Sequence, residues 1–249
     1  MGKIKEDIEI LKMLCDLSPD EVYYKVAEKA LSCGYKAEQI HLNENGMYMY
    51  IEGDLTYPAL VAHVDTVNDY SSNGKEQKLC TPPKEFFYDN QKRVLWSPDL
   101  AGFDDRAGIL GIFNLLDTGY KFPIILLNYE EIGGKGAIEF CNDYIGKVKF
   151  KFFVELDRQG RGESVFYDCN NSFFEFYVNS FGFKTAKGIF SDIYFLAQYF
   201  DAAAVNLSIG YVDEHFYTER IFFDDFYFTI SKVKHMLKTA EKAPYFIYF

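Results

Sequence analysis

The sequence predicts an α/β fold, a three-layer αβα sandwich in which a mixed, mainly parallel sheet lies between helices. Two observations support this prediction. Continuous apolar stretches of strand length, such as 122–129 and 148–156, alternate along the chain with segments of helical period. Strands that are apolar throughout are typical of a parallel sheet covered on both faces. Helices are therefore expected on both sides of the sheet.

The composition allows a large core and restricts the partners. Of the 249 residues, 49% are hydrophobic and 18% are aromatic, which excludes global disorder. The net charge of −11 argues against nucleic acid as a partner, because binding to phosphates needs clustered Lys and Arg. We expect neither a signal peptide nor a membrane span, since no apolar run approaches eighteen residues. One domain over residues 1–249 is expected.

The cysteines indicate the compartment. The chain contains five, Cys15, Cys33, Cys80, Cys141 and Cys169. Their number is odd and no two of them form a CxxC motif, so they are typical of reduced thiols. This usage predicts a cytoplasmic protein.

The N-terminal part is expected to contain two helices and two strands. Residues 4–15 place apolar side chains on one helical face. A capping box at Ser18 predicts the start of a second helix, and Gly34 is expected to end it as a C-cap residue. The loose alternation of 47–52 and the apolar run 58–64 predict two strands.

The middle of the chain begins with a polar, proline-containing segment, 68–98, for which we expect a hairpin around Asp89. The apolar segment 107–116 contains glycine and predicts a helix that is buried on most sides. A central strand is expected at 122–129, and a Gly-Gly turn then leads into a helix that includes 137–141.

The C-terminal part completes the sandwich. One further buried strand, two antiparallel additions, a helix, a strand and a closing helix with one apolar stripe are expected. Their positions are 148–156, 164–167, 173–178, 191–200, 203–209 and 226–237.

Polar residues cluster where the predicted strands end. Ligands of such sheets bind outside the carboxyl ends of the strands. The candidates that follow an apolar strand or open a loop before a helix are His63, Asp65, Asp104, Glu130, Glu131, Asp157 and His215. His63 and Asp65 lie on the same side of their strand, which suits a metal-binding imidazole oriented by a carboxylate. A buried histidine that is merely hydrogen-bonded to an aspartate is the alternative.

Carboxylates gathered at one sheet edge repel one another unless cations hold them. Two divalent cations bound by three carboxylates and two neutral imidazoles would leave an excess of about one positive charge. Such an excess lowers the pKa of a bridging water, so that hydroxide is available near neutral pH. Mixed histidine and carboxylate ligands suit zinc, with cobalt or manganese as alternatives.

Five short segments of this chain resemble those of the co-catalytic dizinc exopeptidases, a superfamily that includes aminopeptidases and peptidase T-like tripeptidases. In order, they are 62–67 (AHVDTV), 103–106 (FDDR), 129–133 (YEEIG), 155–157 (ELD) and 210–215 (GYVDEH). Two-domain members carry an extra lid or dimerisation domain between the positions that match Asp157 and His215. Only residues 158–214 lie there in this chain, so the resemblance implies a single-domain form.

The resemblance also implies the roles of the site residues. His63 and Asp157 would bind one metal ion, Glu131 and His215 the other, and Asp104 would bridge the two ions. The peptide bond after this aspartate is typically cis in the superfamily.

Two further roles follow from the same resemblance. Asp65 would orient His63, and Glu130 would be the general base that activates the metal-bridging water. Three other residues keep two interpretations each. Arg106 either contacts substrate or forms a structural ion pair, Tyr211 either lines the pocket or belongs to the core or rim, and Asp192 lies near the site or caps a helix.

From these expectations we predict a metallo-exopeptidase, most simply an aminopeptidase that acts on short peptides with the aid of two zinc ions. A deacylase of N-acyl amino acids and a carboxypeptidase share the same chemistry and stay open as alternatives. A non-catalytic binding module is a third class, but no expected ligand is missing. The sequence does not indicate the oligomeric state.

Overall fold

The computed structural model describes residues 2–70 and 84–247. Its main sheet has eight strands in the order β1-β2-β6-β3-β7-β10-β8-β9. The four central strands pair in parallel, and they are β6 (Ile124–Leu127), β3 (Ala59–His63), β7 (Phe153–Arg158) and β10 (Ala204–Ser208). Their carboxyl ends therefore lie at one edge of the sheet.

Shorter strands extend the sheet on both sides. At one side β2 (Tyr48–Ile51) and β1 (Ile40–Leu42) are added antiparallel. At the other side β8 (Glu163–Val165) pairs antiparallel with β10, and β9 (Lys184–Thr185) pairs in parallel with β8. The predicted mixed, mainly parallel sheet is thus confirmed.

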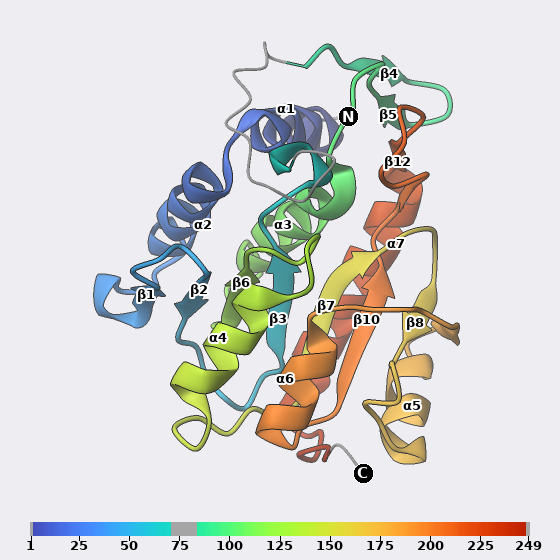
Figure 1. The fold of residues 1–249 in the computed structure, drawn as a ribbon. Coiled ribbons are helices and arrows are strands. Elements are labelled where there is room, and N and C mark those ends of the chain that lie inside the picture. The colour runs from blue at the N-terminus through green and yellow to red at the C-terminus, as the bar shows by residue number, and fades with distance from the viewer. Residues whose placement is uncertain (1, 71–83, 248–249) are drawn as a thin grey trace.

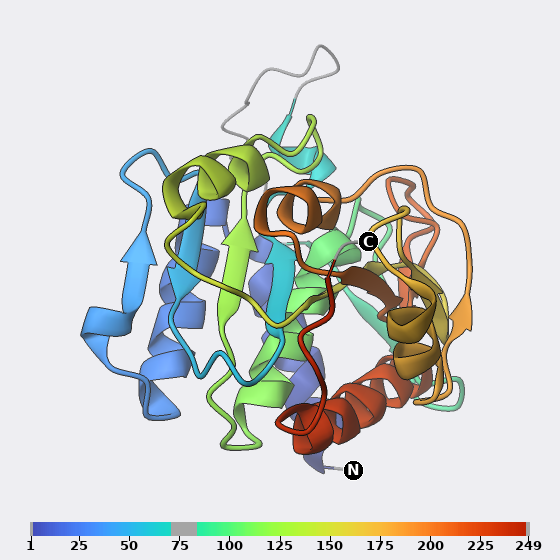
Figure 2. The ribbon, with the colours of Figure 1, turned by 90° about the horizontal axis from the view of Figure 1, so that it is seen from below.

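Helices cover both faces of this sheet (Figures 1 and 2). One face packs against α1 (Gly2–Asp16), α2 (Pro19–Ser32), α3 (Phe103–Leu116) and α7 (Phe223–Ala240), in one hydrophobic cluster. The other face packs against α4 (Lys135–Tyr144) and α6 (Ile193–Phe200), in a second cluster. The two clusters use opposite faces of the same strands, since Leu60 and Ala62 belong to the first and Val61 to the second. The three-layer sandwich is confirmed.

Helix α3 is the most enclosed element. All its residues are buried, and it contacts α1, α2 and α7 as well as β3 and β7. Gly108 allows this close packing, because a Cβ atom there would lie 2.4 Å from the carbonyl oxygen of Leu156 in β7. The N-terminus of α3 is thereby fixed at the edge where the central strands end.

A second, four-stranded antiparallel sheet lies beside this edge (Figure 1). Its order is β11 (Tyr211–Val212), β12 (Arg220–Phe222), β5 (Val94–Trp96) and β4 (Phe87–Asp89). The β4–β5 pair is the predicted hairpin, and the Asp89 carboxylate accepts hydrogen bonds from the main chain of its turn. Residues 71–83 of the predicted polar segment, which include Cys80, lie outside the described residues.

One predicted strand is wrong. Residues 173–178 belong to a helix, α5 (Ser172–Asn179), whose N-cap Asn171 accepts hydrogen bonds from two main-chain N–H groups. Phe174 and Val178, four residues apart, are buried, while Phe173 is 79% exposed. This period is helical, but the many aromatic residues favoured a strand in the sequence.

Two other expectations concern the whole chain. Among the described residues, none of the helices is long and apolar enough to span a membrane. Four cysteines lie in the described part of the chain, Cys15, Cys33, Cys141 and Cys169, and all are free thiols.

Candidate metal centre

The five expected metal ligands come from five separate segments that meet at the carboxyl edge of the central strands (Figure 1). His63 ends β3, Asp157 lies near the end of β7, and Asp104 lies in the first turn of α3. Glu131 follows β6 in the loop before α4, and His215 lies between β11 and β12. The strand-end pattern of the sequence therefore places them in one region.

Asp104 is the centre of this group. Its Oδ1 lies 3.0 Å from Nε2 of His63, and its Oδ2 lies 3.2 Å from Nε2 of His215. His63 Nε2 is also 3.4 Å from an Asp157 oxygen, and His215 Nε2 is 3.1 Å from a Glu131 oxygen. The residues thus form two half-sites, one on each side of the Asp104 carboxylate.

The donor set fits divalent cations. Donor atoms of His63, Asp104 and Glu131 all lie within 4.8 Å of one another. Oε1 of Glu131 is buried and has no hydrogen-bond partner among the described residues. A buried carboxylate oxygen without a partner is costly, and a metal ion bound there would remove that cost.

The electrostatics of the group also favour bound cations. Burial, together with the nearby Asp104 carboxylate, raises the pKa of Asp157 to about 7. Burial likewise raises the pKa of Glu130 to about 10, and the carboxylates of Asp157, Asp192 and Asp104 add to this effect. Hydrogen bonds with Asp104 and Glu131 raise the pKa of His215 to about 11. Buried acids in such number are stabilised by positive charge.

Asp65 connects the two halves of the group. It is fully buried, and its carboxylate lies 3.4 Å from Nδ1 of His63, whose closer neighbour is the main-chain oxygen of Asp65 at 3.0 Å. Its two carboxylate oxygens also accept hydrogen bonds from the main-chain N–H groups of Glu130 and Glu131. The hydroxyl of Tyr70 donates a further bond. The contacts of Asp65 therefore link the loop after β6 to the imidazole of His63.

The loop that carries Glu130 turns sharply. Tyr129, just before Glu130, has a φ of 66°, in the left-handed region that residues other than glycine rarely adopt. His215, in the separate segment between β11 and β12, has the same φ of 66°. The N–H groups of Gly133 and Gly134 donate to the carbonyls of Glu130 and Tyr129. Backbone strain of this kind is typical of functional sites.

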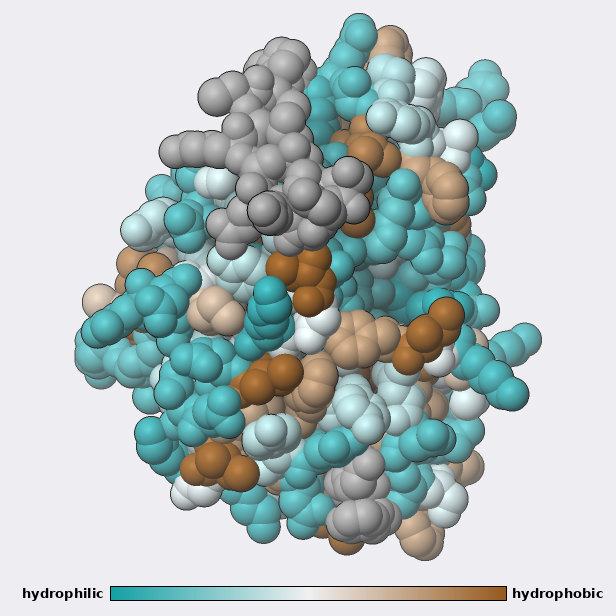
Figure 3. All heavy atoms as spheres, in the orientation of Figure 1, coloured by the Kyte–Doolittle hydropathy of each residue, from teal (hydrophilic) through white to brown (hydrophobic). Residues whose placement is uncertain are grey.

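Glu130 and four of the five candidate ligands, all except His63, line a cavity of about 410 Å³. Its lining residues are Asp104, Glu130, Glu131, Gly133, Asp157, Arg158, Gln159, Tyr167, Ile189, Phe190, Tyr211, Glu214 and His215. In the space-filling view the surface is hollowed and hydrophilic where the strands end, with hydrophobic residues at the margin (Figure 3). No described residue of the segment 68–98 lines this cavity.

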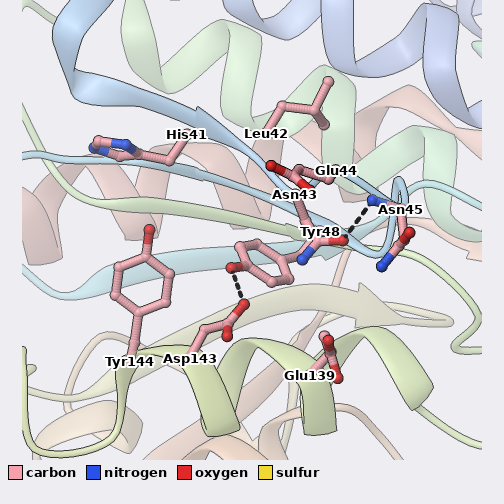
Figure 4. Close-up of a pocket in the computed structure, with 9 residues that line it drawn as sticks. All are labelled: His41, Leu42, Asn43, Glu44, Asn45, Tyr48, Glu139, Asp143 and Tyr144. Carbon is pink, nitrogen blue, oxygen red and sulfur yellow. Dashed lines mark hydrogen bonds between the residues drawn. The ribbon is translucent and has the colours of Figure 1, made fainter.

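A second cavity lies beside β1 and α4 (Figure 4). Several of its polar groups pair with one another: the Tyr48 hydroxyl donates to Asp143, and the Asn43 side chain accepts from the main chain of Asn45. His41 pairs with Glu52. None of the candidate residues of the metal centre lines it.

Three residues with two interpretations are now placed. Arg106 is 1% exposed, does not line the cavity, and donates to the carbonyls of Leu14, Leu17 and Val64. Among the described residues it forms no ion pair with a carboxylate, so the predicted structural ion pair is not found there. The Tyr211 hydroxyl donates to the carboxylate and the main chain of Asp157, at the cavity wall. Asp192 is fully buried and does not cap α6 with its side chain. It does not line the cavity, but its carboxylate is near enough to Glu130 to raise the pKa of that residue.

Two residues of the centre were missed in the sequence. Asp105 is buried, and its carboxylate accepts from the main chain of Gly108 and of His63. Glu219 is 2% exposed and accepts hydrogen bonds from the N–H groups of Gly102 (2.7 Å) and Asp104 (3.0 Å). The only signal for Glu219 was its position four residues after His215.

The peptide bond between Asp104 and Asp105 is cis, as the resemblance implied.

Glu219 is expected to position Asp104. In Glu219→Gln an amide NH₂ group would replace one acceptor oxygen and face a main-chain N–H. We expect metal affinity and any activity to fall about 10- to 100-fold with the fold retained, as for residues that support metal ligands. Isothermal titration calorimetry with the metal ion measures the affinity, and a separate circular dichroism spectrum of the apoprotein checks the fold. Glu28→Gln, in an exposed side chain of α2, is the matched control and is expected to change neither. Unchanged metal affinity in Glu219→Gln would contradict the role.

Comparison with known proteins agrees with this architecture. No family model matches the sequence, and no curated protein sequence matches it. Among solved structures, the aminopeptidase PepT from Bacillus cereus superimposes with a TM-score of 0.71 at 12% identity, covering 95% of this chain and 98% of that one. A tripeptidase from Staphylococcus aureus gives 0.71 at 12%, covering 96% and 99%. The chain has the fold of these peptidases.

A third solved structure extends this result to archaea. An aminopeptidase from Desulfurococcus kamchatkensis superimposes with a TM-score of 0.70 at 15% identity, covering 97% of this chain and 96% of that one. The five sequence motifs resemble those of peptidases, and the fold of this chain agrees with that resemblance.

Proposed function

We propose that this peptidase-fold protein is a metallo-exopeptidase with two zinc ions, most simply an aminopeptidase that hydrolyses short peptides. One observation carries the proposal. The Asp104 carboxylate lies between two imidazoles, each of which has a second carboxylate beside it, and Glu130 lines the same cavity. The names of the superimposed structures, two aminopeptidases and a tripeptidase, favour the same class of substrate.

The proposal assigns each metal ion its ligands. His63 and Asp157 would hold one ion, Glu131 and His215 the other, and Asp104 would contribute an oxygen to each. When bound, the two ions supply Lewis-acid polarisation of the substrate carbonyl and lower the pKa of water. Cobalt or manganese could replace zinc with this ligand set.

Glu130 is proposed as the general base. Its carboxylate would take a proton from the attacking water and deliver it to the nitrogen of the leaving amine. A group that accepts and then donates a proton works best when its pKa is above that of a free carboxylate. Burial without cations raises the pKa of Glu130 to about 10, which would keep it protonated at neutral pH, and the positive charge of the two bound ions would lower this pKa toward the operating range of a base. Asp65, which binds the Glu130 N–H, would hold the base in position.

The remaining expectations belong to the same proposal. We propose that residues 1–249 act as one catalytic domain and that the protein works in the cytoplasm, which the free thiols of the described cysteines support. An N-acyl amino acid deacylase or a carboxypeptidase would use the same centre, so the substrate panel below includes both classes.

Metal removal tests the function. Dialysis of the purified protein against a chelator is expected to abolish hydrolysis of di- and tripeptides, and added zinc, cobalt or manganese is expected to restore it. The panel contains the same peptides with a free amino terminus, with an acetylated amino terminus and with an amidated carboxyl terminus. Preference for a free amino terminus identifies an aminopeptidase. A metal-loaded protein that hydrolyses no member of the panel would overturn the proposal.

A further inference from the structure

The cavity contains one carboxylate that the proposed mechanism does not use. Five acidic residues line it, and Asp104, Glu131 and Asp157 are assigned to metal ions and Glu130 to proton transfer. The fifth, Glu214, is half-buried and precedes His215 directly. The role assigned to Glu214 below rests on the proposed function.

Glu214 is held in place by a neutral partner. Nε2 of Gln159 donates a hydrogen bond to its Oε1 over 2.7 Å. Gln159 follows the proposed ligand Asp157 by two residues, and Glu214 precedes the proposed ligand His215. The pair therefore joins the two chain segments that carry ligands of different half-sites, at the wall of the cavity.

The basic groups near Glu214 have other partners. Arg158, which also lines the cavity, forms two hydrogen bonds with Glu163 at 3.1 and 3.2 Å. Arg220 pairs with Asp213 at 2.9 Å, and Nε2 of His215 faces Asp104 and Glu131. In the described part of the chain, no Lys, Arg or His forms an ion pair with Glu214. Its negative charge is left to face the cavity.

We propose that Glu214 binds an ammonium group of the substrate. A half-buried carboxylate with one neutral partner can accept a charge-assisted hydrogen bond from such a group, and these bonds are roughly twice as strong as neutral ones. A substrate carboxylate would be repelled there, and Arg158, the arginine of the cavity wall, is already bound to Glu163. The charges of the cavity thus favour a peptide that presents its amino group.

Two ammonium groups of a peptide could serve as this ligand. The α-amino group is separated from the first peptide carbonyl by a single carbon atom, so its capture beside the metal ligands would place the first peptide bond at the centre. The ε-amino group of an N-terminal lysine is the other source. The experiment below separates them.

The kinetic test compares wild type and Glu214→Gln on three peptides, Leu-Gly-Gly, N-acetyl-Leu-Gly-Gly and N-acetyl-Lys-Gly-Gly. We expect KM for Leu-Gly-Gly to rise about 10- to 100-fold with kcat nearly unchanged, as for a lost hydrogen bond to a charged group. The two acetylated peptides are measured as competitive inhibitors of Leu-Gly-Gly hydrolysis, because an aminopeptidase would not cleave them, and the inhibition constant of N-acetyl-Leu-Gly-Gly should not change. A rise confined to the lysine peptide would assign the ammonium to the side chain. The matched control is Asp213→Asn, in an adjacent carboxylate that does not line the cavity.

A binding measurement separates this inference from the proposed function. Leucinol and 4-methyl-1-pentanol share one carbon skeleton and differ only in the amino group, and neither contains a peptide bond. Titration into the metal-loaded protein is expected to show that Glu214→Gln weakens leucinol about 10- to 100-fold and leaves the alcohol unchanged. Equal affinity of wild type and Glu214→Gln for leucinol and also for N-acetyl-Lys-Gly-Gly would overturn the role of Glu214, whether or not the protein hydrolyses peptides.

Discussion

Replacing Glu130 by glutamine is expected to lower kcat for peptide hydrolysis by about 10²- to 10⁴-fold, the usual contribution of a general base. Glutamine keeps the size of the side chain and the main-chain bond to Asp65, but it cannot accept the proton of the attacking water. None of the five proposed ligands is changed, so two metal ions per chain should stay bound. Steady-state kinetics combined with metal analysis by mass spectrometry measures both quantities.

Two further variants serve as controls for the effect of Glu130→Gln. Glu131→Gln changes the adjacent residue, a proposed ligand, and should lose metal as well as activity. Glu28→Gln lies on the exposed face of α2, with its side chain 71% exposed, and should behave as wild type. If Glu130→Gln kept the wild-type kcat, Glu130 would not be the base, and another residue of the cavity would have to take its place.

The largest loss of bound metal is expected from Asp104→Asn. This carboxylate gives one oxygen to each half-site, so its replacement by a neutral amide weakens both at once. Substitutions of residues that merely support a ligand cost about 10- to 100-fold, and a shared ligand should cost at least about 100-fold in metal affinity. Bound metal should fall from two ions per chain to one or none, with hydrolysis lost in parallel.

A control on the same helix separates this effect from a change in folding. Asp117 follows the other end of α3, where it pairs with Lys29 and Lys3 at the surface. Asp117→Asn should keep both metal ions and the activity, and thermal unfolding of both variants reports on the fold. An Asp104→Asn protein that still holds two metal ions at wild-type affinity would show that Asp104 is not the bridging ligand.

Much of the fold was predictable from hydrophobic patterns. The uniformly apolar strands and the long helices α1, α2 and α7 each carry a strong period of their own, and the structure contains all of them. The short elements were not predictable in this way. Strand β1 has three residues, and β11 and β12 have two and three, too few for a period to be visible.

The strand-end rule explains why the candidate site could be found in the sequence. Parallel strands deliver the residues that follow them to one edge, so His63, Glu131 and Asp157 had to lie near each other once the sheet was correct. Glu219 and Arg106 act through main-chain groups distant in sequence. A main-chain group can be a hydrogen-bond partner in a residue of almost any type, so the sequence does not reveal such bonds. For this reason the role of Glu219 was missed and that of Arg106 stayed ambiguous.

The enclosed position of α3 implies that its metal-binding end is formed by folding, before metal ions bind. Because this helix is buried on all sides, we expect the amide protons of its interior to exchange with solvent only when the domain opens globally. Asp104 is attached to the N-terminus of this stable helix and is fixed by the bond from its main-chain N–H to Glu219. Its donor atoms are therefore in place before any cation arrives, so that loading the apoprotein should leave its circular dichroism spectrum almost unaltered.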